Sequence, residues 1–234
     1  YVVDNTLTSP YLFLPKAVKA SLSVNSLSKY FGGHGNALGG SVTDTGVFDW
    51  RTCPNILDIY KVPASDPSLW AMLQLRKKGL RDFGGTLAPE AAHVLSVGSE
   101  TLALRMDRAC GNASRLALFL STHPKVKHVN YPGLNSHPQN SLAKELFKRP
   151  GALLSFVLAD GMDPFAFINR LKLAICSSNL GDNRTLIIPV AHTIFYEMGP
   201  ARRASMGIED GMMRLSVGIE DPEDLLEDFA QALG

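Results

Sequence analysis

The sequence predicts an α/β protein, and three observations support this. Short apolar runs rich in β-branched residues alternate with segments whose apolar residues recur every three or four positions. Asp-Pro pairs, typical of helix starts, precede three of the helical segments. Of the 234 residues, 45% are hydrophobic and 19% are charged, which is typical of a folded globular chain and not of a disordered one.

Three short strands are predicted in the first part of the chain. Val2 and Val3 are interpreted as the end of a buried strand that runs into a polar turn at residues 4–6. Residues 21–24 and 41–43 alternate polar with apolar or β-branched side chains, as strands do. The glycines between them predict a tight loop that carries Lys29 at a strand end. Open α/β sheets bind their ligands at such strand ends.

The middle of the chain is predicted to be a loop followed by helices. Residues 48–65 are loop-like. Asp66 is the expected N-cap of a helix that runs to Lys78 and ends at Gly79. From residue 89 to residue 122, apolar side chains at spacings of three and four predict one long helix, with Gly98 as the point where it could be interrupted.

In the second half, strands and helices alternate. The final helix opens with an acidic turn that complements its dipole. Helices are predicted at residues 139–147 and 164–171 and from residue 221 onward. Strands are predicted at residues 126–130, 152–158, 173–176, 185–188 and 213–217.

Charge and cysteine content exclude several classes of protein. Lys and Arg number 23 against 22 Asp and Glu, which gives a net charge of +1 and no field to attract nucleic acid. Three dispersed cysteines form neither a disulfide framework nor a metal-binding pair. We therefore expect no bound metal and a cytoplasmic location. Apolar runs fall short of the roughly 18 residues of a membrane span.

Lys29 lies among hydroxyls and glycines, where more than one chemistry is open to it. In one interpretation it forms a Schiff base with an aldehyde cofactor, whose phosphate Ser26 and Ser28 bind. In another, Ser26 and Lys29 form the reactive pair of an acyl-serine hydrolase. A solvated lysine in a glycine-rich loop is the plain alternative. Asp4 favours the first interpretation, because a pyridine cofactor needs a carboxylate to keep its ring nitrogen protonated.

The order of motifs along the chain resembles the pyridoxal-phosphate (PLP) enzymes of cysteine and methionine metabolism. The likeness is carried first by Val3-Asp4-Asn5-Thr6 and by Ser26-Leu27-Ser28-Lys29-Tyr30. It continues through residues 9–10, 33–34, 79–85, 101–106, 131–134, 179–182 and 214–221. The resemblance covers essentially the whole chain and implies the aspartate-aminotransferase-like fold of PLP-dependent transferases, fold type I.

The same resemblance implies roles for the residues that could bind PLP. Lys29 would be the catalytic lysine, which binds the cofactor covalently and carries protons. Asp4 would pair with the ring nitrogen, and Ser26 and Ser28 would bind the phosphate.

On the substrate side, Arg214 would bind the α-carboxylate, a task for which a planar bidentate guanidinium is well suited. Asn179 stands beside that carboxylate, where many relatives carry serine. Residues 191–196 depart from the pattern common in the family.

The implied activity is that of an enzyme acting on an amino-acid substrate. Residues 81–85 and 179–186 are most similar to the sulfhydrylase branch, which implies γ-replacement on an activated homoserine, of sulfhydrylase or cystathionine γ-synthase type. Residues 79–82 and 100–108 are also similar to methionine γ-lyase, so a carbon–sulfur lyase of cystathionine or methionine is the alternative. Two further alternatives are an acyl-serine hydrolase and a non-catalytic protein of this fold. The family also implies a homotetramer, a dimer of dimers with active sites shared between subunits.

The same resemblance implies two domains. Residues 1–105 would be the C-terminal portion of a large PLP-binding domain with its linker helix, and residues 106–234 a C-terminal α/β domain. Because family members are considerably longer, Tyr1, Val2 and Val3 are expected to belong to an interior strand, with an N-terminal part missing before them.

Overall fold

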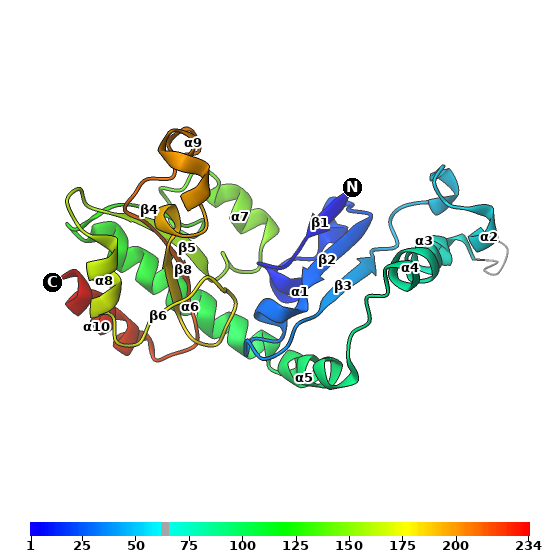
Figure 1. Cartoon of the computed structure of the whole chain (residues 1–234), viewed down its shortest axis with the longest axis horizontal. Coiled ribbons are helices and arrows are strands. Elements are labelled where there is room, and N and C mark those ends of the chain that lie inside the picture. Colours follow the sequence, from blue (N-terminus) through cyan, green and yellow to red (C-terminus); the bar gives the residue numbers. More distant parts are fainter. Residues whose placement is uncertain (62–65) are drawn as a thin grey trace.

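Two β-sheets and the long helix between them position the predicted site residues (Figure 1). The computed structural model describes residues 1–61 and 66–234. Within that part of the chain, one sheet has the strand order β1-β2-β3 and the other the order β4-β5-β8-β7-β6. The long helix α6 (Leu102–Thr122) runs from the first sheet toward the second. The predicted α/β class is therefore confirmed.

The first sheet brings two predicted cofactor residues to one edge. Strand β1 (Val2–Asp4) is parallel to β2 (Leu22–Ser26), which pairs on its other side with antiparallel β3 (Gly40–Asp44). Parallel pairing places the carboxyl ends of β1 and β2, at Asp4 and Ser26, side by side. Strand β1 is an edge strand, and Val2 is 55% exposed. Among the described residues only β2 pairs with β1, so the interior position of this strand in a longer protein stays a prediction.

Beyond β3 the chain extends away from both sheets before it returns (Figure 1). The extension contains α2 (Asp58–Lys61), α3 (Trp70–Gln74), a π-helical segment (Leu75–Leu80) and α4 (Arg81–Phe83). The short helix α1 (Ser9–Leu12) lies before it, between β1 and β2. Asp66 caps this helical run as predicted, accepting a hydrogen bond from the Ser68 amide at 2.9 Å.

The predicted end of that helix, at Gly79, is wrong. The helical backbone continues through Gly79 and stops at Gly84, whose φ of +71° is the left-handed conformation that ends helices. The predicted loop at residues 48–65 contains a 3-10 turn, Trp50–Thr52, besides α2. Its last four residues, 62–65, lie outside the described residues.

The long helix predicted over residues 89–122 is two helices, α5 (Pro89–Glu100) and α6, separated at Thr101. The break comes three residues after Gly98, which stays helical. Gly98 instead allows close packing, since a Cβ there would lie 2.3 Å from the carbonyl oxygen of Gly32. The break lets α5 pack on the segment that carries Lys29 while α6 packs on the second sheet.

The second sheet confirms the five strands predicted after residue 125. Its members are β4 (Val126–Asn130), β5 (Leu153–Leu158), β6 (Ile175–Cys176), β7 (Leu186–Pro189) and β8 (Met212–Ser216). Strand β6 is parallel to β7, and the other pairs are antiparallel. The helices of this half are α7 (Asn140–Leu146), α8 (Pro164–Arg170), α9 (Gly199–Ser205) and α10 (Pro222–Leu233). Sequence patterns missed only α9 among these four.

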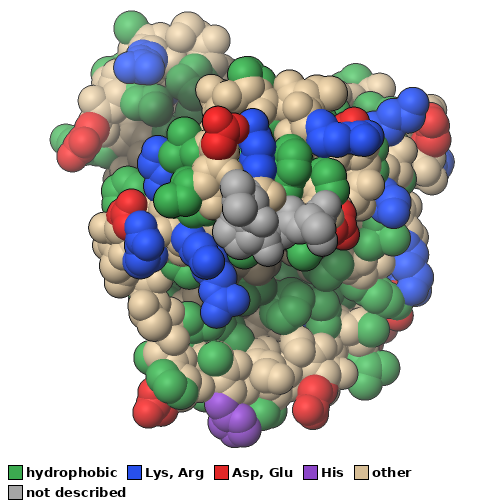
Figure 2. All heavy atoms as spheres, turned by 90° about the vertical axis from the view of Figure 1, so that its right-hand side faces the viewer, with side chains coloured by type: hydrophobic (Ala, Val, Ile, Leu, Met, Phe, Trp, Pro, Cys, Tyr) green, Lys and Arg blue, Asp and Glu red, His purple; other side chains and the backbone are tan. Residues whose placement is uncertain are grey.

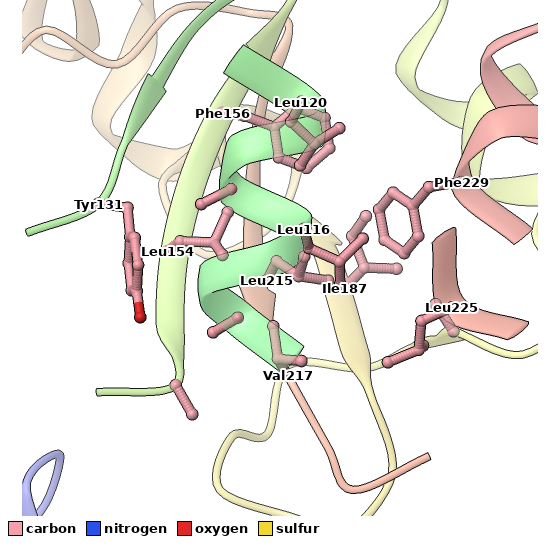
Figure 3. Packing of buried hydrophobic residues seen from close by; sticks show 14 of the residues in the cluster. Leu116, Leu120, Tyr131, Leu154, Phe156, Ile187, Leu215, Val217, Leu225 and Phe229 are labelled. Carbon is pink, nitrogen blue, oxygen red and sulfur yellow. The ribbon is translucent and has the colours of Figure 1, made fainter. Parts of the chain in front are cut away.

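One hydrophobic core joins α6, the second sheet and α10 (Figure 3). Leu116 and Leu120 of α6 lie over the sheet, and Phe229 of α10 packs beside Ile187 and Leu215. All five side chains are at most 1% exposed. Burial of each such side chain contributes about 1.5–3 kcal/mol to the free energy of unfolding, so this core fixes the position of β8, which carries Arg214.

None of the described helices combines the length and the apolar character needed to cross a membrane.

Candidate active site

Lys29 occupies a π-helical turn, Leu27–Phe31, that follows directly on β2. Its own backbone angles (φ −96°, ψ −133°) are not helical. Two hydrogen bonds close the turn, from the Gly32 amide to the Leu27 carbonyl at 2.9 Å and from the Gly33 amide to the Lys29 carbonyl at 2.8 Å. The predicted loop is therefore an ordered turn, and Lys29 lies at its centre.

Three of the predicted site residues meet although they are far apart in sequence. Nζ of Lys29 donates a hydrogen bond to Oδ1 of Asn179, 150 residues further along the chain. Arg214, on β8, donates from Nη2 to the carbonyl oxygen of Asn179 at 3.1 Å and to that of Ser178 at 2.7 Å. Asn179 thus links the lysine amine to the guanidinium.

The surroundings of Arg214 suit an anionic ligand. Burial lowers the pKa of its guanidinium, and the nearby Tyr30 opposes that shift. An arginine nonetheless stays protonated at neutral pH. Arg214 lines a cavity of ≈ 280 Å³ with Asn130, His137 and Ser155, and none of the described residues that line it is acidic. A carboxylate is the kind of group that this charge would attract.

Asp4 and Ser26 are joined through Thr6. Asp4 Oδ1 accepts a hydrogen bond from the Thr6 amide at 3.0 Å, and Thr6 Oγ1 accepts one from the Ser26 amide at 2.8 Å. No contact within the described residues joins Asp4 to Lys29 directly. The side chain of Asp4 is exposed at the sheet edge and so is accessible to a ligand.

The two serines predicted to bind phosphate differ in their surroundings. Ser26 Oγ makes no hydrogen bond within the part of the chain that the structure describes, so its proton is available. Ser28 Oγ donates to the Gly39 carbonyl at 3.3 Å and accepts from the Gly39 amide at 3.0 Å. Because a hydroxyl has one proton, Ser28 can donate to a phosphate only by releasing the Gly39 carbonyl.

The described residues fit a cofactor that has an aldehyde, a pyridine nitrogen and a phosphate. A lysine amine, a carboxylate at a neighbouring strand end and a free hydroxyl are the three partners that these groups need. The acyl-serine alternative is not supported. In the structure the amine of Lys29 is hydrogen-bonded to Asn179, and no hydrogen bond joins it to Ser26 in the described chain.

Sequence reasoning missed the residues that pack beneath Lys29. Tyr30 is buried, and its hydroxyl lies 3.4 Å from Oγ of Ser216. Burial raises the pKa of Tyr30 to about 12, so the phenol is neutral. Ser216 Oγ also accepts a hydrogen bond from the Gly181 amide at 2.8 Å. Ser216 lies in one of the motifs that carry the family resemblance, and this membership was its only signal in the sequence.

The turn Leu27–Phe31, here called the lysine turn, leaves no room for a side chain at Gly181. The φ of Gly181 is +74°, and a Cβ there would lie 2.6 Å from the Tyr30 nitrogen and 3.0 Å from the Lys29 carbonyl carbon. We expect Gly181→Ala to lower the free energy of unfolding by about 1–3 kcal/mol through overpacking, in addition to the cost of its positive φ. Urea-induced unfolding measures this loss.

Gly207→Ala is the matched control for this prediction. Gly207 also has a positive φ, +70°, but nothing lies within 4 Å of a Cβ built on it. The control therefore carries the backbone penalty alone and should lose less stability than Gly181→Ala. Equal losses in the two variants would show that contact with the lysine turn is not what requires glycine at position 181.

Comparisons with known proteins cover the whole chain. A family model described as "Cys/Met metabolism PLP-dependent enzyme" matches residues 1–234. The chain is 37% identical to an O-acetyl-L-homoserine sulfhydrylase of Leptospira meyeri, over 99% of the chain and 57% of that protein. It is 38% identical to an L-methionine gamma-lyase of Pseudomonas putida, over 99% of the chain and 53% of that protein. The chain thus spans little more than half the length of these curated relatives.

A solved structure agrees with these matches. The structure of an O-acetylhomoserine sulfhydrylase of Wolinella succinogenes superposes with a TM-score of 0.87 at 37% identity, covering 100% of this chain and 63% of the other.

Proposed function

Because the chain belongs to the Cys/Met metabolism family of PLP-dependent enzymes, we propose that its protein catalyses γ-replacement on an activated homoserine, of sulfhydrylase or cystathionine γ-synthase type. The predicted family and the fold type I architecture are confirmed by the family match and the TM-score of 0.87. The contact of the Lys29 amine with Asn179, whose carbonyl oxygen Arg214 binds, supports proton removal beside a bound carboxylate. The observation that carries replacement over cleavage is the TM-score of 0.87, at 37% identity, with a solved O-acetylhomoserine sulfhydrylase.

Four residues of the chain would hold the cofactor. Lys29 would bind its aldehyde carbon, Asp4 would keep the pyridine nitrogen protonated, and Ser26 would donate to the phosphate together with Ser28. When bound, PLP supplies an electron sink for the charge that remains on a substrate carbon after proton removal.

The remaining steps belong to side chains of this chain. Arg214 binds the substrate α-carboxylate and thereby fixes the orientation of Cα. Asn179 holds the Lys29 amine close to that bound carboxylate. The amine of Lys29, set free when the substrate amine takes its place, would remove the proton at Cα and return a proton at the end of the reaction. Asn179 therefore contacts both the proposed proton carrier and the proposed carboxylate anchor.

The alternative, a carbon–sulfur lyase, is supported by sequence identity. The chain is 38% identical to the methionine gamma-lyase and 37% identical to the sulfhydrylase, a difference of one percentage point. Both reactions begin with proton removal at Cα next to a bound carboxylate, so the same arrangement of Lys29, Asn179 and Arg214 serves either.

A panel of substrates distinguishes the two reactions in the full-length protein loaded with PLP. O-Acetyl-L-homoserine with sulfide tests replacement through homocysteine formation, and O-succinyl-L-homoserine with cysteine tests the cystathionine γ-synthase reaction. L-Methionine and cystathionine test cleavage through release of a 2-oxo acid. We expect thiol or thioether formation from an activated homoserine to be the fastest reaction, and Lys29→Ala to abolish it.

The lyase alternative would be supported if methionine or cystathionine were cleaved faster than any homoserine ester is converted. A panel in which no substrate reacts, with PLP bound to Lys29, would support a non-catalytic protein of this fold and contradict both reactions.

We also propose a homo-oligomer, a dimer of dimers with shared active sites. Support comes from exposed apolar side chains on the extension between β3 and α5. Phe83 is 93%, Ile59 69% and Leu80 56% exposed. Figure 2 shows hydrophobic side chains lying among Lys and Arg on this face. Large apolar side chains that are exposed together are typical of protein interfaces.

Two further proposals concern domain organisation and location. We propose that residues 1–105 belong to the large PLP-binding domain and residues 106–234 form the C-terminal domain. The position of the first sheet before α6 and of the second sheet after it supports this division. We propose a cytoplasmic location, which the odd number of unpaired cysteines supports.

A further inference from the structure

Arg105 of α6 is a buried arginine, and two of its hydrogen bonds go to the segment that carries Lys29. Its side chain is only 7% exposed. Nη1 donates to the Tyr30 carbonyl at 2.7 Å, and Nη2 donates to the Phe31 carbonyl at 2.9 Å. Tyr30 and Phe31 directly follow Lys29 in the π-helical turn. Arg105 therefore binds the backbone immediately after the proposed catalytic lysine.

The other donors of Arg105 anchor it to the helix break. Nη2 also donates to the Gly98 carbonyl at 2.7 Å, and Nε donates to Thr101 Oγ1 at 3.1 Å. Thr101 is the residue at which α5 and α6 separate. The guanidinium thus joins the end of α5, the start of α6 and the lysine turn.

Within the described chain no carboxylate contacts Arg105, so its charge is held only by carbonyl and hydroxyl oxygens. Burial lowers the pKa of this guanidinium, which is the direction expected for a cation without a counter-ion. Its desolvation is unfavourable, and an uncharged residue could fill the same space.

Two glycines, Gly33 and Gly98, make room for the contact between Arg105 and the lysine turn. A Cβ on Gly33 would lie 2.2 Å from Nη1 of Arg105, and Gly33 has a φ of +74°. A Cβ on Gly98 would lie 2.3 Å from the Gly32 carbonyl oxygen. The lysine turn is therefore confined on the side of α5 and α6 as well as by Gly181.

We propose that Arg105 is a positioning residue: by holding the carbonyl groups of Tyr30 and Phe31 it fixes the direction of the Lys29 side chain toward Asn179. The proposal rests on the proposed function of Lys29, and it goes beyond that function by assigning the lysine's placement to α6. The planar guanidinium donates in three directions at once, whereas the ammonium of lysine cannot meet the same oxygens.

The test uses Arg105→Lys in the full-length protein, with two separate measurements. The first is the rate at which an amine-acylating reagent modifies Lys29 in the cofactor-free protein, followed across pH by mass spectrometry of the peptide. We expect Lys29 to react several times faster and with a shifted pH profile, because its amine has left Asn179. The second is turnover with PLP, which we expect to fall about 100-fold, as a displacement of about 1 Å can cause.

Thr101→Val is a milder second variant in case Arg105→Lys does not fold. It keeps the guanidinium and removes the hydroxyl that orients it, so it should change Lys29 labelling in the same direction by a smaller factor.

Arg203→Lys is the matched control. Arg203 is also buried, 8% exposed, and donates to the Tyr196 carbonyl and Asp210, away from the lysine turn. It should lower thermal stability without changing the labelling of Lys29. Unchanged labelling and pH profile in both Arg105→Lys and Thr101→Val would overturn the positioning role. Failure of borohydride to fix PLP on wild-type Lys29 would instead contradict the proposed function, while the labelling comparison still decides the role of Arg105.

Discussion

Replacing Lys29 with alanine should lower turnover by at least about 10⁴-fold, since proton transfer by a positioned side chain is worth up to that factor. Among the described residues, Lys29 is the only lysine whose amine contacts Asn179, so no other amine can replace it. Lys29→Arg should be equally inactive. It keeps a positive charge that could reach Asn179, but a guanidinium neither bonds to an aldehyde carbon nor releases a proton at neutral pH.

Covalent attachment gives a second measurement of the same prediction. Borohydride reduction should fix PLP on the peptide that contains residue 29, and mass spectrometry should find no such product in Lys29→Ala. Lys16→Ala is the control, because Lys16 is an exposed lysine of the same half of the chain. PLP fixed on another lysine in wild-type protein, or retained by Lys29→Ala, would contradict the assignment of Lys29.

Arg214→Ala should weaken substrate binding far more than cofactor binding. Removing one partner of a buried, hydrogen-bonded ion pair costs about 2–5 kcal/mol. Because Arg214 is half-buried, we expect the lower end, about 2 kcal/mol or roughly 30-fold in kcat/KM. The loss should appear mainly as a raised KM for the amino acid. Arg214→Lys should show a smaller loss, because lysine keeps the charge and loses the bidentate geometry.

The amount of PLP that borohydride fixes on Lys29 separates the two effects. It should stay close to the wild-type amount in Arg214→Lys, in which a cation can still reach the Ser178 carbonyl. Arg115→Ala is the control, since Arg115 is exposed and pairs with the exposed Glu223 on α10. Equal loss of substrate and cofactor binding in Arg214→Lys would contradict a carboxylate-binding role.

Much of the secondary structure follows from the sequence because its signals are local. The Asp-Pro pairs at residues 66, 163 and 221 start helices as predicted, and each aspartate accepts a hydrogen bond from a backbone amide two residues later. The helix that passes Gly79 shows the limit of this reasoning. A glycine ends a helix only where the backbone takes a positive φ, and that occurs at Gly84.

Short elements without such signals were missed. The π-helical turn around Lys29 has the composition of a loop, and its shape depends on partners outside the turn. Strand β1 has the composition of a buried strand, and in this chain it lies at a sheet edge with Val2 exposed, as expected for an interior strand without its preceding segment. Burial depends on what lies beside a segment, which a periodic pattern does not contain.

The sequence by itself determined the family and the chemical groups of the site, because a lysine amine, a carboxylate and a guanidinium are recognisable from residue type and motif order. Only the tertiary structure decided three hydrogen bonds: from the Lys29 amine to Asn179, from Arg214 to the carbonyl of that asparagine, and from Arg105 to the backbone of the lysine turn. These contacts join residues that lie up to 150 positions apart. Their existence depends on the pairing of strands, on the break at Thr101 and on the packing of α6, none of which is encoded in a single short segment.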